Sequence, residues 1–170
     1  MKIEVYRNAE SVAQKAAAFV AAEARAAVSA RGSFVMAVSG GHTPWQMLLA
    51  LADEDVPWDS VHVVQVDERV APAGDPDRNL THLRESLLEH VPLRSERIHA
   101  MPVESSDLQA ACEEYALTLQ AVAGSRPSST SFTWDSDPTA TRLHSCLVTR
   151  FSRSKMQMSR SLRFTREGDA

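Results

Sequence analysis

The chain has 170 residues, 44% of them hydrophobic, and a formal net charge of −4. This length fits one domain whose core needs no disulfide bonds, and the charge indicates neither nucleic acid nor an anionic membrane as a partner. The two cysteines, Cys112 and Cys146, match no metal-binding spacing, and no apolar run reaches the about 20 residues of a membrane helix. The N-terminal segment lacks the apolar core of a signal peptide, so we expect a cytoplasmic protein.

The composition changes near Gly124. Residues 1–124 carry 10 Lys and Arg against 18 Asp and Glu, whereas residues 125–170 carry 8 against 4. Sixteen of the last 46 residues are Ser or Thr, and hydrophobic periodicity is weak there. We therefore expect an ordered domain over residues 1–124 and an irregular, disordered tail over residues 125–170.

Strand and helix patterns alternate along the first part of the chain. The Val-rich run at 61–66 is typical of a strand inside a parallel sheet, and the Ala-rich run at 9–30 has helical spacing and stops before Gly32. This alternation predicts an α/β fold of Rossmann-like type, with a mostly parallel sheet flanked by helices. The predicted strands are 3–6, 33–38, 61–66 and 97–101, and the predicted helices are 9–30, 43–51, 80–90 and 107–122.

The first candidate site is the sequence SGGHTP, where a predicted strand stops and a helix begins. Gly40 and Gly41 let the backbone N–H groups approach a ligand, and the following helix offers further N–H groups and a positive dipole end. Ser39, His42 and Thr43 could add side-chain donors. A phosphate site is one interpretation, and a tight turn without a ligand is the other. The segment matches neither the P-loop nor the dinucleotide fingerprint.

The second candidate site is the sequence VDERVAP, which follows the Val-rich strand. Asp67 and Glu68 could serve acid–base chemistry, and Arg69 could clamp a phosphate, but a solvated charge cluster is the favoured interpretation of this pattern by itself. Asn79 could bind a sugar hydroxyl or cap the next helix. In parallel sheets ligands bind at the carboxyl ends of the strands, so we expect the two loops to lie close together.

The remaining histidines form no metal-binding motif, and no serine-hydrolase motif is present. We therefore expect neither metal-dependent nor serine-hydrolase chemistry.

The order of the motifs resembles the 6-phosphogluconolactonase family over about residues 1–124. Members of this family show SGG(S/T)xP and then DERxVP; residues 39–41, 43 and 44 match the first motif, and residues 67–70 and 72 match the second. The family usually has a Ser-Asn pair before the next helix, whereas this chain has Arg78 and Asn79. The family shares its fold with glucosamine-6-phosphate deaminase and ribose-5-phosphate isomerase, but DERxVP favours the lactonase.

This resemblance implies hydrolysis of 6-phosphogluconolactone to 6-phosphogluconate, a step of the pentose phosphate pathway. The first loop would then hold the 6-phosphate with help from Arg69, Asp67 would line the sugar end, and no metal or cofactor would take part. The implied partner is the sugar-phosphate lactone alone, and the oligomeric state stays open. The base would be a histidine in a later motif, DGHTASL.

That later motif is absent, and the sequence TWDSDPTATRLHS, residues 133–145, stands at its place. When the codons of this segment are read one nucleotide earlier, the triplets permit the string L-G-L-G-P-D-G-H-T-A-S-L. This coincidence predicts a frameshift between about Gly124 and Ser128, a tail translated out of frame, and an incomplete fold with impaired activity. The alternatives are a sugar-phosphate isomerase or deaminase, a non-enzymatic sensor, or a sugar-phosphate-binding fragment without activity.

Overall fold

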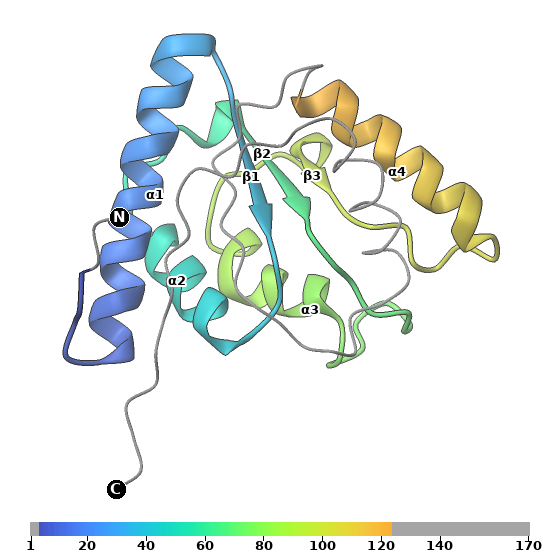
Figure 1. Ribbon diagram of the computed structural model, residues 1–170, viewed down its shortest axis with the longest axis horizontal. Helices are drawn as coiled ribbons and strands as arrows, with labels where there is room; N and C mark the ends of the chain where they lie inside the picture. Colours follow the sequence, from blue (N-terminus) through green and yellow to red (C-terminus); the bar gives the residue numbers. More distant parts are fainter. Residues whose placement is uncertain (1–3, 124–170) are drawn as a thin grey trace, which may run out of the picture.

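The computed structural model describes residues 4–123 of the protein. Three parallel strands lie in the order β1-β2-β3, and Figure 1 shows this sheet between α1 on one side and α4 on the other. The predicted α/β architecture is therefore confirmed. The elements are α1 (Ala9–Arg31), β1 (Phe34–Val38), α2 (His42–Ala52), β2 (Val61–Gln65), α3 (Asn79–Leu83), β3 (Ile98–His99) and α4 (Leu108–Ala123), with 3-10 turns at Trp58–Ser60 and Ser95–Arg97.

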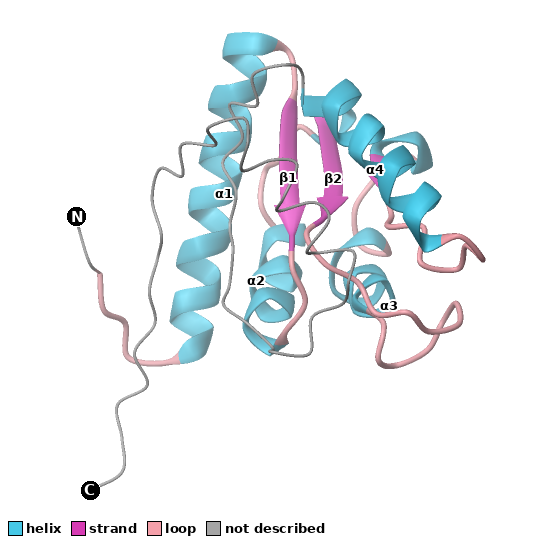
Figure 2. Cartoon of the chain, turned by 45° about the vertical axis from the view of Figure 1, so that its right-hand side comes forward, coloured by secondary structure: helices cyan, strands magenta, loops and turns pink. Residues whose placement is uncertain are grey.

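The sheet separates two apolar layers. One face, which includes Phe34 and Val63, packs against α1, α2 and the segment that begins with α3. The opposite face, which includes Val64, packs against α4 through Tyr115 and Leu119. Successive strand residues point to opposite faces of a sheet, and this alternation explains why neighbouring residues of β2 belong to different layers. Figure 2 shows α1 and α4 on the two sides of the strands.

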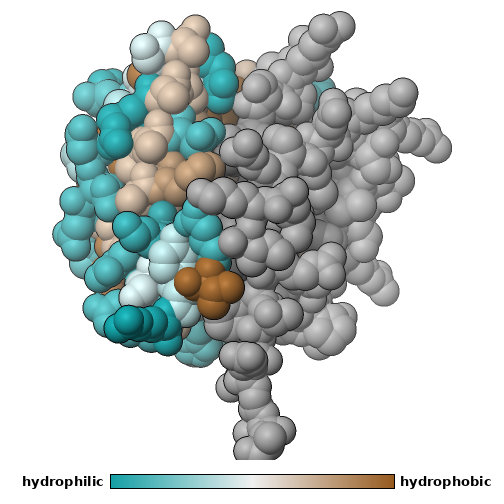
Figure 3. Space-filling model, turned by 60° about the vertical axis from the view of Figure 1, so that its left-hand side comes forward, coloured by the Kyte–Doolittle hydropathy of each residue, from teal (hydrophilic) through white to brown (hydrophobic). Residues whose placement is uncertain are grey.

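Helix α1 packs through small side chains. Its buried residues are six alanines and Val20, and they let α1 lie close to α2. The Asn8 side chain accepts a hydrogen bond from the Ser11 N–H at 2.8 Å, and Gly32 ends the helix with φ of 79°. Figure 3 shows the molecule with the left-hand side of Figure 1, where α1 lies, turned forward. Hydrophilic residues border a narrow strip of weakly hydrophobic ones there.

Three of the predicted elements differ from the structure. Of the strand predicted at 3–6, residue 3 lies outside the described part, and residues 4–6 form no strand. Val5 is 89% exposed, so the alternating apolar side chains of this segment have no layer to pack on. Strand β3 keeps only two of the five residues predicted for it. The predicted helix 80–90 begins with α3 and continues as a π-helical turn, Arg84–Leu88. The other predicted helices and strands are confirmed within one or two residues.

No helix among residues 4–123 is long and apolar enough to cross a membrane. The predicted tail, with Cys146, lies outside the described residues.

A chain of three basic side chains links β2 to β3. His62 Nδ1 lies 3.0 Å from His99 Nε2, and Arg97 Nη1 lies 2.7 Å from His62 Nε2. Because a guanidinium can only donate, His62 Nε2 accepts, and the His62 Nδ1–H donates to His99. The geometry therefore requires a neutral His62. Burial lowers the pKa of both histidines, and the Arg97 charge and then His99 lower the pKa of His62 further.

The histidine pair makes the stability of the fold dependent on pH. Because the two pKa values are lowered in the folded chain, the unfolded chain binds more protons below the ordinary histidine pKa of 6.5. Stability is then complete above this pH and decreases as the pH falls below it. We expect His99→Gln to flatten the dependence of the unfolding free energy on pH between about 7.5 and 5, measured by urea denaturation. An unchanged slope in this variant would contradict the assignment, and His90→Gln, at an exposed histidine, is the control.

Candidate functional site

The two candidate loops meet at the carboxyl ends of β1 and β2. The register pairs Val38 with Gln65, and the Val66 N–H donates to the Val38 carbonyl at 2.9 Å. Both loops therefore leave the sheet side by side. The sequence-based expectation that they lie close together is confirmed.

Asn79 joins the two loops. Its Nδ2 donates to Asp67 Oδ2 at 3.1 Å and to the Asp67 carbonyl at 3.2 Å. A Cβ atom on Gly40 would collide with Oδ1 and Cγ of Asn79, so the amide group lies directly against the glycine backbone. Asn79 is 9% exposed, and its side chain does not cap α3. The structure thus places Gly40, Asp67 and Asn79 together, with the Asn79 amide serving to connect the loops.

Asp67 is held by two donors. Besides Asn79, the Arg69 Nη1 donates to Asp67 Oδ2 at 3.0 Å. The two side chains are 25% and 15% exposed, so this ion pair is screened from water more than a surface pair is. The Asp67 carboxylate therefore has a fixed orientation at the carboxyl edge of the sheet.

The SGGHTP loop presents hydrogen-bond donors at the start of α2. Gly41 occupies the N-cap position with φ of 120°, which is unfavourable for other residues, and no side chain caps the helix. The Ser39 Oγ is buried and has no hydrogen-bond partner among the described residues. His42 and Thr43, in the first turn of α2, are exposed. Unpaired backbone N–H groups, a dipole end and an unsatisfied hydroxyl together favour an anion.

Glu68 organises the second loop from the interior. The side chain is 0% exposed, yet its carboxylate accepts hydrogen bonds from Gln65 Nε2 and from the backbone N–H groups of Arg69, Asn79 and Leu80, at 2.7–2.9 Å. Two of these N–H groups belong to the first turn of α3. Glu68 is therefore the group that caps α3, and it does so from eleven residues earlier in the chain.

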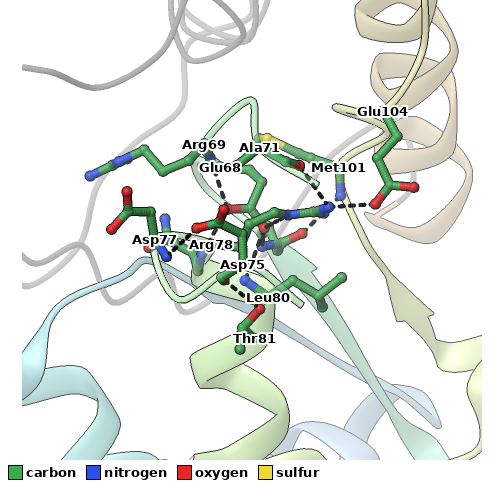
Figure 4. A network of polar contacts seen from close by, with 12 residues as sticks. Glu68, Arg69, Ala71, Asp75, Asp77, Arg78, Leu80, Thr81, Met101 and Glu104 are labelled. Carbon is green, nitrogen blue, oxygen red and sulfur yellow. Dashed lines mark hydrogen bonds and ion pairs between the residues drawn. The ribbon is translucent and has the colours of Figure 1, made fainter. Parts of the chain in front are cut away.

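Arg78 completes the charge balance around Glu68. Its Nε lies 3.5 Å from Glu68 Oε2, and its Nη1 donates to Glu104 Oε1 at 2.5 Å and to the Ala71 carbonyl at 3.4 Å. Figure 4 shows the Arg78 side chain extending between Glu68 and Glu104. Arg78 is 3% exposed, so its charge is compensated inside the protein.

The sequence suggested acid–base chemistry for Glu68 and gave no sign that it caps α3, and it left the role of position 78 open. A carboxylate directly after a buried strand was the available signal for Glu68. No local pattern relates Arg78 to Glu104, because they lie 26 residues apart and meet only in the fold. The same network reaches α4, since the Gln65 Oε1 accepts from the Met101 N–H and the Gln65 N–H donates to the Tyr115 hydroxyl.

Within residues 4–123, no group of three or more His, Cys, Asp or Glu side chains is arranged to hold a metal ion.

The contact between Gly40 and Asn79 gives a direct test of the site geometry. We expect Gly40→Ala to destabilise the chain by about 1–3 kcal/mol, because overpacking of a tight contact displaces its neighbours. In an Asn79→Ala background the same change should have a much smaller effect, since the colliding atoms are gone. A double-mutant cycle by urea denaturation measures this coupling, and additive effects would contradict the contact.

The buried carboxylate gives a second test. We expect Glu68→Gln to lower the unfolding free energy by about 3–5 kcal/mol, because an amide NH2 then faces N–H donors and the buried guanidinium of Arg78 loses one of its two anionic partners. Glu113→Gln, on the exposed face of α4, is the matched control. Equal unfolding free energies for the two variants would show that the network contributes little.

The chain is similar to proteins of one family along most of its length. It matches the model described as "Glucosamine-6-phosphate isomerases/6-phosphogluconolactonase" over residues 7–134. It is 35% identical over 126 residues to a 6-phosphogluconolactonase of Streptomyces coelicolor, covering 69% of this chain and 48% of that protein. A 6-phosphogluconolactonase of Nostoc is 35% identical over 101 residues, covering 59% and 42%. The chain thus spans about half the length of the curated relatives it matches.

Solved structures show the same fold. A 6-phosphogluconolactonase of Shewanella baltica aligns with a TM-score of 0.59 and 27% identity, covering 67% of this chain and 48% of the other. A 6-phosphogluconolactonase of Thermotoga maritima aligns with a TM-score of 0.64 and 20% identity, covering 72% and 55%. A monomeric glucosamine-6-phosphate deaminase aligns with a TM-score of 0.62 and 20% identity, covering 72% and 51%. Because the family model covers most of the sequence, the chain belongs to the glucosamine-6-phosphate isomerase/6-phosphogluconolactonase family.

Proposed function

We propose that the chain carries the sugar-phosphate-binding half of a 6-phosphogluconolactonase, an enzyme that hydrolyses 6-phosphogluconolactone to 6-phosphogluconate. This proposal rests on one observation: the loop of residues 39–41 lies next to Asp67, Arg69 and Asn79 at the carboxyl ends of β1 and β2. Relatives named 6-phosphogluconolactonase support the choice of reaction.

The substrate phosphate would bind to the N–H groups of residues 40–43 at the start of α2, with the Ser39 hydroxyl as a further donor. This hydroxyl is buried without a partner among the described residues, and a phosphate oxygen would satisfy it. His42 and Thr43 are exposed in the first turn of α2 and would contact the outer phosphate oxygens. Arg69 would add positive charge from the neighbouring loop.

Asp67 would orient the sugar next to this phosphate. Its carboxylate is held by Arg69 and Asn79, so it would accept a hydrogen bond from a sugar hydroxyl without changing its position. The lactone carbonyl also needs a base that takes a proton from the attacking water. The family resemblance assigns this base to the histidine of the DGH motif, and residues 4–123 contain no such motif. No metal or cofactor takes part in the proposed reaction.

We further infer that the gene is shifted in frame between about Gly124 and Ser128. The codons of residues 133–145 permit the missing DGH motif when they are read one nucleotide earlier, and the composition changes at the same place. The 170-residue chain would then bind a sugar phosphate in the cytoplasm without turning it over. The inferred tail lies outside the described residues.

An isomerase or deaminase is the alternative within the family. The deaminase structure shares the fold at 20% identity, which leaves the reaction open. The lactonase is favoured because relatives of this name are 35% identical. Incubation of the frame-restored protein with 6-phosphogluconolactone and, separately, with glucosamine 6-phosphate distinguishes the two reactions through their products.

We expect the 170-residue chain to have negligible lactonase activity and the frame-restored protein to have full activity, because only the latter contains the histidine base. The measurement is hydrolysis of 6-phosphogluconolactone by both proteins, purified from a host without its own lactonase. Replacement of the restored histidine by Gln is the control and should abolish turnover. Turnover by the 170-residue chain would overturn the assignment of the base, and an inactive frame-restored protein would overturn the lactonase proposal.

The frameshift itself is tested by resequencing the gene across the codons for residues 122–130. An unshifted reading that encodes the DGH motif would make the 170-residue sequence an artefact. A confirmed shift would mean that the gene encodes a binding loop without its base.

A further inference from the structure

Arg78 is one of the residues at which this chain departs from the motifs of the family that it resembles. The family resemblance leads us to expect Ser before Asn79, and an arginine there introduces both a charge and a long side chain. The structure buries this side chain, which is 3% exposed. A buried guanidinium is unfavourable unless anions and acceptors surround it, so its partners determine where it lies.

The partners of Arg78 come from two separate loops. Glu68 and Ala71 belong to the loop after β2, whereas Glu104 belongs to the loop between β3 and α4. Glu68 is fully buried, and the Glu104 side chain is 58% exposed. Arg78 thus stays buried while it connects a buried carboxylate to an exposed one, and it links the two loops (Figure 4).

Arg78 is next in sequence to Asn79, the residue that connects the SGGHTP loop to the loop after β2. Arg78 is the N-cap residue of α3 with an extended backbone, φ −78° and ψ 130°, and Asn79 is the first residue of that helix. The Asn79 amide lies against Gly40 and donates to Asp67. A displacement of Arg78 therefore moves Asn79 relative to the SGGHTP loop.

We propose that the ion pair between Arg78 and Glu104, which we call the clasp, holds Asn79 against Gly40. Arg78 is then a positioning residue for the phosphate site. The phosphate part of this inference rests on the proposed function. Arg78 itself has its charge compensated by Glu68 and Glu104, so it acts on the ligand through Asn79 and Gly40.

Positioning and simple electrostatics predict opposite effects for Glu104→Gln. The change removes a negative charge near an anion site, and electrostatics alone would strengthen anion binding. Release of the clasp would instead loosen Asn79 and weaken binding. Glu96, at the amino end of β3, is exposed and pairs with Arg94, so Glu96→Gln reports the effect of the same change in net charge at a surface residue away from the site.

The test is a titration of the 170-residue chain with inorganic phosphate, followed by the backbone amide NMR signals of Gly40 and Gly41. We expect Glu104→Gln to bind phosphate about three- to tenfold more weakly than the parent chain, and Glu96→Gln to bind as tightly or slightly more tightly. In an Arg78→Ser background, Glu104→Gln should have no further effect. Binding by Glu104→Gln as tight as by Glu96→Gln would overturn the proposal.

A second measurement without phosphate separates the clasp from the proposed function. We expect Glu104→Gln to broaden or shift the side-chain amide signals of Asn79, whereas Glu96→Gln should leave them unchanged. If the parent chain binds no phosphate, the proposed phosphate site is wrong, and the Asn79 signals still test the clasp. Unchanged Asn79 signals in Glu104→Gln would overturn the clasp whatever the phosphate affinity is.

Discussion

The polar side of this domain depends on one buried charge, the carboxylate of Glu68. An ionised carboxylate that is removed from water is stable only when donors and positive charge surround it. Here four N–H groups donate to it, and the guanidinium of Arg78 lies 3.5 Å away as its ion-pair partner. These donors come from β2, from the loop after it and from the first turn of α3. The requirement to surround Glu68 therefore determines where α3 begins and how the loop between β2 and α3 returns to the sheet.

The two helix N-termini at this edge of the sheet are used differently. Glu68 occupies the N-terminus of α3, so the unpaired N–H groups and the positive dipole end of that helix are satisfied within the protein. The N-terminus of α2 has no side-chain cap, and the Ser39 hydroxyl beside it is buried without a partner among the described residues. The same physical device therefore stabilises the fold at α3 and supports the proposed anion site at α2. Asn79 connects the two, because it starts α3 and lies against Gly40 next to α2.

In the proposed function, binding and chemistry are separated along the sequence. Residues 39–43, 67–69 and 79 assemble the proposed phosphate and sugar contacts from the first half of the fold, and the relatives are about twice as long as the matched region. The proposed base belongs to a later motif. A loss of that motif would leave recognition of the sugar phosphate intact while preventing activation of the attacking water. In physical terms, a preformed set of donors for an anion needs no proton transfer, whereas lactone hydrolysis does.

The sequence by itself determined the features that depend on local patterns. The spacing of apolar residues was sufficient for α1, α2, α4 and the strands β1 and β2, because a buried stripe or face must repeat with the period of its element. The sequence also showed that Gly40 and Gly41 precede a helix start and that a polar loop follows β2. Only the tertiary structure decided that residues 4–6 form no strand, because that requires a neighbouring surface to pack on. It also decided the roles of Glu68, Arg78 and Glu104, since these charges are far apart in sequence and must meet inside the fold before burial can make their pairing necessary.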